Sequence, residues 1–151
     1  MGKSASGKDH IYARLAAHEG LGLKKLVFYT TRPIRAEEEN GKQYYFVDDK
    51  KLEEFRSSGN LIEARAYHTV HGIWNYFTAD DGQVDLGRSD YLGIGTLESF
   101  VKLREYYGDD VMRPVYIEVE DGERLERALA RERTQEVPKY EEMCRRFLAD
   151  Q

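Results

Sequence analysis

Two glycines separated by four residues, Gly2 and Gly7, stand directly before Lys8 near the start of the chain. Glycines let a backbone curl tightly, so that successive N–H groups turn toward phosphate oxygens. A lysine in this position can hold the β and γ phosphates of a nucleotide, and the N-terminus of a following helix adds a favourable dipole. We therefore predict a phosphate-binding loop whose ligands are Gly2, Ser4, Ser6, Gly7, Lys8 and Asp9. A small-residue turn before a helix is the simpler alternative.

Asp9 occupies the position after the lysine, where a phosphate loop of this pattern carries Ser or Thr as a magnesium ligand. A carboxylate is also a hard oxygen ligand, so Asp9 is a candidate ligand for Mg²⁺. Equally, an acidic residue in the first turn of a helix interacts favourably with the helix dipole. The residues alone leave both roles open.

A second group of side chains has the chemistry of a monophosphate site. Arg32 and Arg35 carry planar, permanently charged forks that match phosphate oxygens. Tyr44 and Tyr76 can donate hydrogen bonds to the same group from their hydroxyls. Taken singly, the tyrosines could be ordinary residues of a half-buried sheet. Glu63, a further candidate, could by itself be a solvated strand residue.

The order of these residues resembles the signature of the guanylate kinase family. Residues 30–35 read T-T-R-P-I-R and are similar to the family's T-T-R-x-x-R segment, and residues 40–46 match the following N-G-x-x-Y-x-F. The resemblance continues through residues 61–63 and 75–78, and more weakly through the C-terminal helices, so that it covers most of residues 1–146. This ordered set is far more specific than the phosphate loop alone.

The resemblance implies a nucleoside monophosphate kinase of the guanylate kinase type, which transfers a phosphoryl group from ATP to GMP with Mg²⁺ as cofactor. By resemblance, Glu63 accepts the adjacent N1–H and N2–H groups of guanine, and Thr78 lies near the guanine carbonyl. Adenine cannot make that pair of hydrogen bonds, so discrimination should be large. The resemblance assigns the GMP phosphate to Arg32, Arg35, Tyr44 and Tyr76.

Residues 131–146 resemble the family's lid and the helix after it. Cations from a closing lid stabilise charge on the transferring phosphoryl group. We favour Arg133 and Arg146 as catalytic residues beside Lys8, whereas other arginines of this acidic and basic segment can form ordinary i,i+4 pairs.

The chain departs from the family at several positions. The acidic pair that the family carries for magnesium organisation and guanine contact corresponds to Gly93 and Gly95, and Phe28 stands where a small hydroxyl residue is usual. Glycine supplies no ligand, so either another carboxylate replaces the pair, Asp9 first and Asp90 second, or catalysis suffers. The alternatives are therefore a guanylate-kinase-like binding module with weak or no catalysis, and a phosphate-loop kinase for a different small acceptor.

The elements that must position these side chains follow from apolar periodicity and turn residues. Helices are predicted over residues 9–19, from 48 or 49 to before 59, over 97–107, around 125–129 and over 140–148. Strands are predicted over 26–29, 44–47, 61–67, 73–77, 91–94 and 115–119, with 61–67 and 73–77 antiparallel. This alternation favours an α/β fold with a parallel sheet. The resemblance makes it a three-layer phosphate-loop kinase fold, in which a small β-rich insertion at about residues 30–79 binds the nucleoside monophosphate.

Composition limits the class of protein. The 151 residues suit a single domain, and a net charge of −5 disfavours binding to nucleic acid. Cys144 is the only cysteine, and no apolar stretch approaches the roughly 20 residues of a membrane span. With no signal peptide after Met1, we expect a soluble cytoplasmic protein that binds ATP and GMP but neither nucleic acid nor membrane. Nothing in the residues indicates its oligomeric state.

The phosphate loop has an unusual setting, because no buried strand precedes it in the sequence. The family's final strand and helix likewise have no counterpart up to Gln151. We therefore expect residues 1–6 to be weakly anchored unless a ligand orders them.

Overall fold

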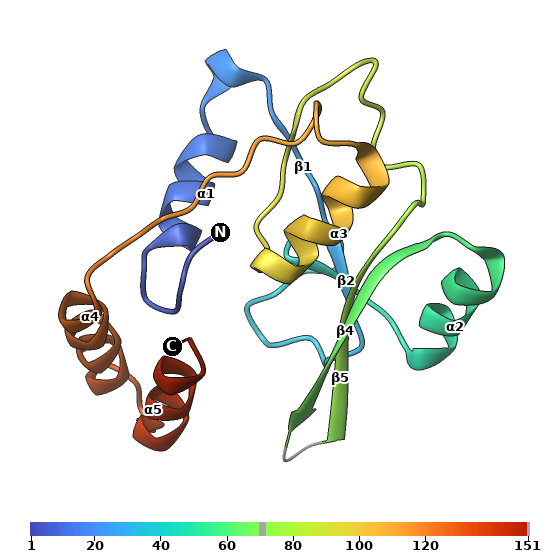
Figure 1. Cartoon of the computed structure of the whole chain (residues 1–151). Coiled ribbons are helices and arrows are strands. Elements are labelled where there is room, and N and C mark those ends of the chain that lie inside the picture. The colour runs from blue at the N-terminus through green and yellow to red at the C-terminus, as the bar shows by residue number, and fades with distance from the viewer. Residues whose placement is uncertain (70–71, 151) are drawn as a thin grey trace.

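The computed structural model describes residues 1–69 and 72–150, and its ribbon divides into two halves (Figure 1). One half is a sheet flanked by helix α2 (Asp49–Ser58). The other half gathers three helices around the N-terminal loop, namely α1 (Lys8–Ala16), α4 (Asp121–Arg133) and α5 (Tyr140–Ala149). Helix α3 (Leu97–Tyr107) lies between them and packs against the sheet.

The sheet has four strands in the order β3-β2-β5-β4, where β2 is Phe28–Thr30, β3 is Tyr44–Phe46, β4 is Leu61–Thr69 and β5 is Gly72–Ala79. Strand β2 is parallel to β3 and antiparallel to β5. The predicted antiparallel pair is confirmed as β4 and β5, with Glu63 opposite Thr78 and Arg65 opposite Tyr76. Because side chains alternate across a strand, these four residues share one face of the sheet.

The opposite face of the sheet carries the main apolar core. Tyr29, Phe77 and Ala79 are buried there with Leu52 of α2, and the Tyr29 ring stacks on Phe77 with 5.0 Å between centroids. Aromatic residues suit this position because each removes a large apolar area from water.

Helix α2 begins and ends where its capping residues predict. The Asp48 carboxylate accepts a hydrogen bond of 2.9 Å from the Lys51 N–H, and Gly59 closes the helix at a φ of 77°. A side-chain acceptor satisfies one of the unpaired N–H groups at a helix start, and glycine adopts the left-handed conformation at its end without strain.

A second, parallel sheet is shorter than the sequence predicts. It consists of β1 (Lys24–Lys25) and β6 (Tyr91–Leu92). The predicted strand over 115–119 is wrong, since that segment is assigned to no strand. An extended segment forms a ladder only when a neighbouring strand takes up its backbone groups. Within the described residues, only Met1 pairs with the backbone of residues 115–119. Its N-terminal amine donates to the Val115 carbonyl, and its own carbonyl accepts from the Ile117 N–H.

The expectation that residues 1–6 are weakly anchored is also wrong. Besides the contacts of Met1, the backbone of Ser4 hydrogen-bonds to side chains of Arg124 in α4 and Asp150 at the end of α5. These contacts anchor the loop, and sequence periodicity cannot predict them because they join residues more than 100 positions apart.

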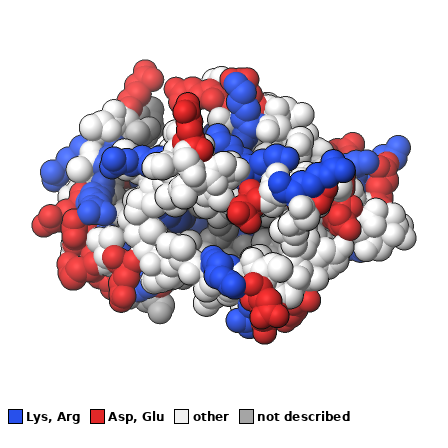
Figure 2. Space-filling view, turned by 90° about the horizontal axis from the view of Figure 1, so that it is seen from above, with Lys and Arg blue, Asp and Glu red and all other residues white. Residues whose placement is uncertain are grey.

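The helices are otherwise close to their predicted ranges, and α3 has the predicted limits of 97 and 107. Of the helices that the structure describes, none is long and apolar enough to cross a membrane. Figure 2 shows Lys and Arg interspersed with Asp and Glu over the face seen from above.

Candidate nucleotide-binding and phosphoryl-transfer site

Two glycines shape the N-terminal loop. Gly7 is the N-cap of α1 at a φ of +84°, a conformation that side chains other than glycine rarely adopt. A Cβ atom on Gly2 would lie 2.7 Å from the Ser6 Oγ and 2.8 Å from the Ile117 carbonyl oxygen. Both positions therefore require glycine, one for conformation and the other for space. Ala5 has a φ of 60° and is the one residue other than glycine with positive φ among those described.

The loop presents unused donors at the start of α1. Across the described part of the chain, the N–H groups of Gly7, Lys8 and Asp9 have no acceptor, and no carboxylate pairs with the Lys8 ammonium. The buried Ser6 Oγ likewise has no hydrogen-bond partner. Free N–H groups at a helix N-terminus, next to a lysine, form a binding site for an anion such as a phosphate. The predicted loop residues are thus brought together.

Arg124 fastens this loop to the C-terminal helices. Its Nε donates a hydrogen bond of 3.0 Å to the Ser4 carbonyl oxygen, and its Nη2 donates one of 3.1 Å to the Asp150 Oδ2. The same Asp150 oxygen accepts a hydrogen bond of 2.6 Å from the Ser4 N–H. Arg124 is fully buried, with its guanidinium 5.0 Å from the Phe147 ring. Sequence reasoning missed this contact, because an arginine among the many charged residues of α4 looks like a surface residue.

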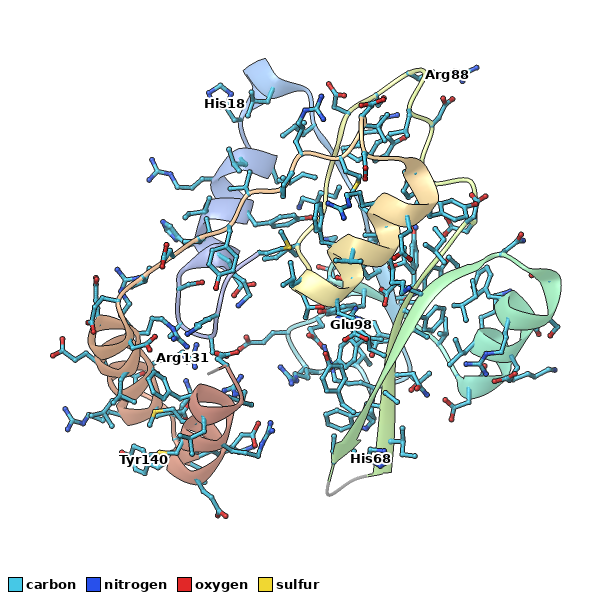
Figure 3. All side chains as sticks on the ribbon, viewed as in Figure 1. His18, His68, Arg88, Glu98, Arg131 and Tyr140 are labelled. Carbon is cyan, nitrogen blue, oxygen red and sulfur yellow. The ribbon has the colours of Figure 1, made fainter. Side chains whose placement is uncertain are left out.

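The arginines of the predicted lid region differ in how close they lie to the phosphate loop. Arg146 lines a small hollow together with Ser4 and Ala5, and Arg131 lines the same hollow. Figure 3 shows Arg131 extending from α4 toward the space between the two halves. Arg133 is exposed and does not line this hollow. Arg131 therefore lies nearer to the phosphate loop than the predicted Arg133 does.

The predicted acceptor-phosphate residues lie on the sheet face away from the aromatic core. The Arg32 guanidinium is buried beside the Tyr44 ring, 5.6 Å from its centroid, and the Tyr44 and Tyr76 rings meet edge to face at 5.6 Å. The Arg32 Nε is buried without a partner among the described residues. Arg35 is exposed at the edge of this group.

Glu38 occupies the Arg32 fork. Both terminal nitrogens of Arg32 donate to the Glu38 carboxylate, at 2.7 and 2.8 Å, and the Arg35 N–H donates to it at 2.9 Å. The hydrogen bonds from Arg32 lower the pKa of Glu38 to about 2. A bidentate carboxylate uses the same donors that a phosphate would use, so an incoming phosphate has to share or displace Glu38. The sequence signal is weak, since Glu38 lies in a run of three glutamates.

An electrostatic interaction links the two halves of the site. Burial raises the pKa of the Tyr44 hydroxyl, and the neighbouring Tyr76 and the Asp9 carboxylate add to this rise. The Asp9 carboxylate in the first turn of α1 is therefore close enough to Tyr44 for an electrostatic interaction between the phosphate loop and the acceptor-phosphate residues.

The predicted base-reading residues are buried at the other end of the same sheet face. The Thr78 hydroxyl donates 2.9 Å to the Glu63 Oε1. Arg65, which sequence reasoning missed, donates from Nε to the Glu63 Oε2 at 2.9 Å and from Nη1 to the Thr96 Oγ1 at 3.1 Å. A spacing of two residues in a strand was the available signal for Arg65, because it places both side chains on one face.

The described residues contain no group of three or more His, Cys, Asp or Glu side chains that could hold a metal ion. At Gly95, a Cβ would lie 2.5 Å from the Ser99 Oγ, so no carboxylate fits at that position without a shift. Asp90 precedes β6 whereas Gly93 and Gly95 follow it. Asp9 is exposed next to the phosphate loop. One carboxylate beside nucleotide phosphates and water is a common arrangement for Mg²⁺, so Asp9 fits this ion.

Known proteins resemble the chain in sequence and in structure. Residues 1–76 match the family model for guanylate kinase. The guanylate kinase of Wolbachia sp. subsp. Brugia malayi is 38% identical over 106 residues, which are 68% of this chain and 53% of that protein. The guanylate kinase of Koribacter versatilis is 30% identical over 121 residues, which are 78% of this chain and 51% of that protein.

A crystal structure of guanylate kinase from Anaplasma phagocytophilum superimposes with a TM-score of 0.58 at 28% identity and covers 85% of this chain and 64% of that one. The chain spans about half the length of the Wolbachia and Koribacter guanylate kinases. The sequence match reaches from the phosphate loop through Tyr76, and the fold match extends over most of the chain. The chain therefore belongs to the guanylate kinase family.

Proposed function

We propose that this chain transfers the γ-phosphoryl group of ATP to GMP, giving ADP and GDP. The observation that carries the proposal is one sheet face on which Arg32, Tyr44 and Tyr76 lie together, with Glu63 and Thr78 further along it. This face has the chemistry of a nucleoside monophosphate site, with cationic and hydroxyl donors for a phosphate and a carboxylate for a base. In the proposed reaction, the anion site at the start of α1 supplies the donor phosphate to this face.

Each half of the site has a separate task in this reaction. Lys8 and the free loop N–H groups hold the donor phosphates, while Arg32 and Arg35 orient the acceptor phosphate. Arg146, together with Arg131, supplies positive charge from the lid side, whereas the exposed Arg133 needs a lid movement to contribute. Positioning and charge stabilisation dominate phosphoryl transfer, so no general base of tuned pKa is required. Closure of the lid excludes water, which would otherwise hydrolyse ATP.

Asp9 would hold the Mg²⁺ ion that accompanies ATP. The ion, when bound, neutralises charge on the phosphate oxygens. Replacing Asp9 by Ser keeps an oxygen ligand but removes its charge, and should raise the Mg²⁺ concentration needed for half-maximal activity by about tenfold. A titration of activity against Mg²⁺ measures this shift, and an unchanged midpoint would remove Asp9 from the metal site.

A binding module with weak or no catalysis is the second candidate. Two observations favour it, namely the Glu38 carboxylate in the Arg32 fork and the packing of Ser99 against Gly95, where the family carries an acidic residue. The free Lys8 favours the enzyme, because a module that only binds GMP has little need of it.

A coupled assay of ADP release separates these functions. The enzyme should release ADP with GMP and dGMP, and not with AMP or without an acceptor. GMP binding without turnover would establish the module instead. ATP binding with indifference to GMP would indicate a kinase for a different small acceptor.

The proposal includes a division of labour along the single domain of residues 1–151. Residues of about 30–79 form the acceptor-binding part, and residues of about 131–146 form the lid. Use of ATP and the presence of a single cysteine support a cytoplasmic location.

A further inference from the structure

Glu63 and Arg65 form a closed ion pair where the base of the acceptor should bind. The Glu63 side chain is 2% exposed and that of Arg65 is 10% exposed. Arg65 donates to both carboxylate oxygens, from Nε to Oε2 at 2.9 Å and from Nη2 to Oε1 at 3.3 Å. A base that reaches Glu63 therefore meets Arg65 as well.

The acceptor capacity of Glu63 is nearly used up within the protein. A carboxylate offers about four lone-pair sites in total. Three are taken in this structure, two by Arg65 and one by the Thr78 hydroxyl. One site remains, so Glu63 can accept one N–H group from a base but not two at once.

The Thr78 hydroxyl cannot donate to a carbonyl of the base, because its proton is already used in a hydrogen bond to Glu63. A hydroxyl has one proton, and that of Thr78 points at the Glu63 Oε1 because a carboxylate only accepts. Arg65 has five N–H donors, of which three serve Glu63 and Thr96. The Tyr67 side chain also interacts with this guanidinium. We assign to a carbonyl oxygen of the base the Arg65 N–H donor that Glu63, Thr96 and Tyr67 leave unused.

Gly95, which lies just before α3, provides no second carboxylate beside Glu63. A Cβ at Gly95 would already lie 2.5 Å from the Ser99 Oγ. The N2 amino group of a guanine thus lacks both a free second site on Glu63 and a carboxylate at position 95.

We propose that Glu63 and Arg65 act as one unit that reads the 6-oxo and N1–H edge of a purine, so that the acceptor class is 6-oxopurine nucleoside monophosphates, inosine monophosphate (IMP) as well as GMP. Arg65 donates to O6 and Glu63 accepts N1–H, while N2 contributes little. This inference rests on the proposed function and specifies its acceptor. Adenine is rejected at both positions, because it presents a donor at N6 and an acceptor at N1.

The test compares kcat/KM of the wild-type chain for GMP, IMP and AMP. IMP should lie within about thirtyfold of GMP, since a site that hydrogen-bonds N2 would reject the analogue lacking it by about 10⁴-fold. AMP should be poorer than IMP by at least about a thousandfold. A larger gap between GMP and IMP overturns the inference, although GMP turnover alone still upholds the proposed function.

If GMP is not turned over, the proposed function fails and equilibrium binding decides the inference. Calorimetric dissociation constants for GMP and IMP that agree within about thirtyfold support it. Binding of GMP alone, or of neither nucleotide, overturns it. These measurements use the unaltered chain, so they do not depend on whether a variant folds.

Arg65→Gln tests the role of the arginine directly. The variant should lower kcat/KM for IMP by about a hundredfold and leave AMP unchanged, because only the 6-oxopurines lose a hydrogen bond to a charged group. GMP should fall less than IMP, since the loss of Arg65 frees acceptor sites on Glu63 for the N2 amino group. A merely structural role would lower all three values equally. Arg56→Gln is the matched control, since Arg56 pairs with Glu53 on an exposed helix face and should change none of them.

Discussion

The half that contains the four-stranded sheet, here the acceptor half after its proposed role, and the half that contains the N-terminal loop, the donor half, are held together in different ways. Thr30, Phe77 and Thr78 are fully buried in the four-stranded sheet, with an aromatic core on one face and a polar site on the other. Helix α1 of the donor half has no buried residue. Its loop is held instead by Arg124 and Asp150, through hydrogen bonds that span 120 and 146 positions.

This difference teaches where each site obtains its rigidity. The Glu63–Thr78 contact spans 15 positions within one hairpin, so strand pairing alone brings the two residues together. The phosphate loop depends on α4 and α5 being folded and in place. We therefore expect the acceptor site to be preorganised and the donor site to loosen first when the C-terminal helices are disturbed.

Of the variants considered, Lys8→Met should show the largest difference between its effects on the donor site and on the acceptor site. It should lower kcat by about 100- to 1,000-fold, because a preorganised cation near the transferring phosphoryl group is lost. The GMP dissociation constant and the unfolding midpoint should stay as in the wild type, since Lys8 pairs with no carboxylate in the described chain. Lys50→Met on the exposed face of α2 is the control. A parallel loss of GMP affinity would contradict the separation of the two sites.

Arg124→Met should loosen only the donor half. The free energy of unfolding should fall by about 2 to 3 kcal/mol, because the variant leaves the Ser4 carbonyl without its donor and the partly buried Asp150 without its charged partner. Hydrogen exchange should accelerate in residues 3–7 and in α5, but not in β5. Lys102→Met in α3 removes an exposed pair with Glu105 and serves as the control. Equal loss of protection in both halves would refute the distinction.

Glu38→Gln should destabilise the acceptor half by about 1.5 kcal/mol at pH 7, through loss of a charged hydrogen bond. Folding lowers the Glu38 pKa from 4.5 to about 2, so the pair stabilises the fold above pH 4.5 and ceases to do so as the pH falls to about 2. The difference in urea midpoint between wild type and variant should therefore shrink across this window. A difference independent of pH would exclude the ionised pair as its cause.

Ala5→Gly should have the smallest effect and the opposite sign. Ala5 holds a φ of 60°, where glycine avoids steric strain, so the variant should gain about 0.5 kcal/mol of unfolding free energy. Ala13→Gly in the middle of α1 should lose a similar amount. Chemical denaturation of the two variants side by side measures both, and a loss in each would show that the loop is unstrained.

Much of the fold followed from local signals. Asp48 and Gly59 delimit α2, and apolar alternation identifies β4 and β5, because caps and strand periodicity depend on neighbouring residues. The prediction of a strand over 115–119 was wrong because it depended on residues that are distant in the sequence. Its apolar residues have the right pattern, but a strand also needs a partner, and partners come from elsewhere in the chain.

The site divides in the same manner. Residue types and spacing predicted a phosphate loop and a site for a monophosphate and a base, since glycine conformation, arginine forks and a carboxylate act through their own chemistry. Only the tertiary structure decided that Glu38 fills the Arg32 fork, that Arg65 shares Glu63, and that Arg124 ties the loop to α5. These contacts depend on tertiary packing, which no local sequence pattern encodes. Packing determines which of the many charged side chains are buried, and a buried charge is stable only when it is paired.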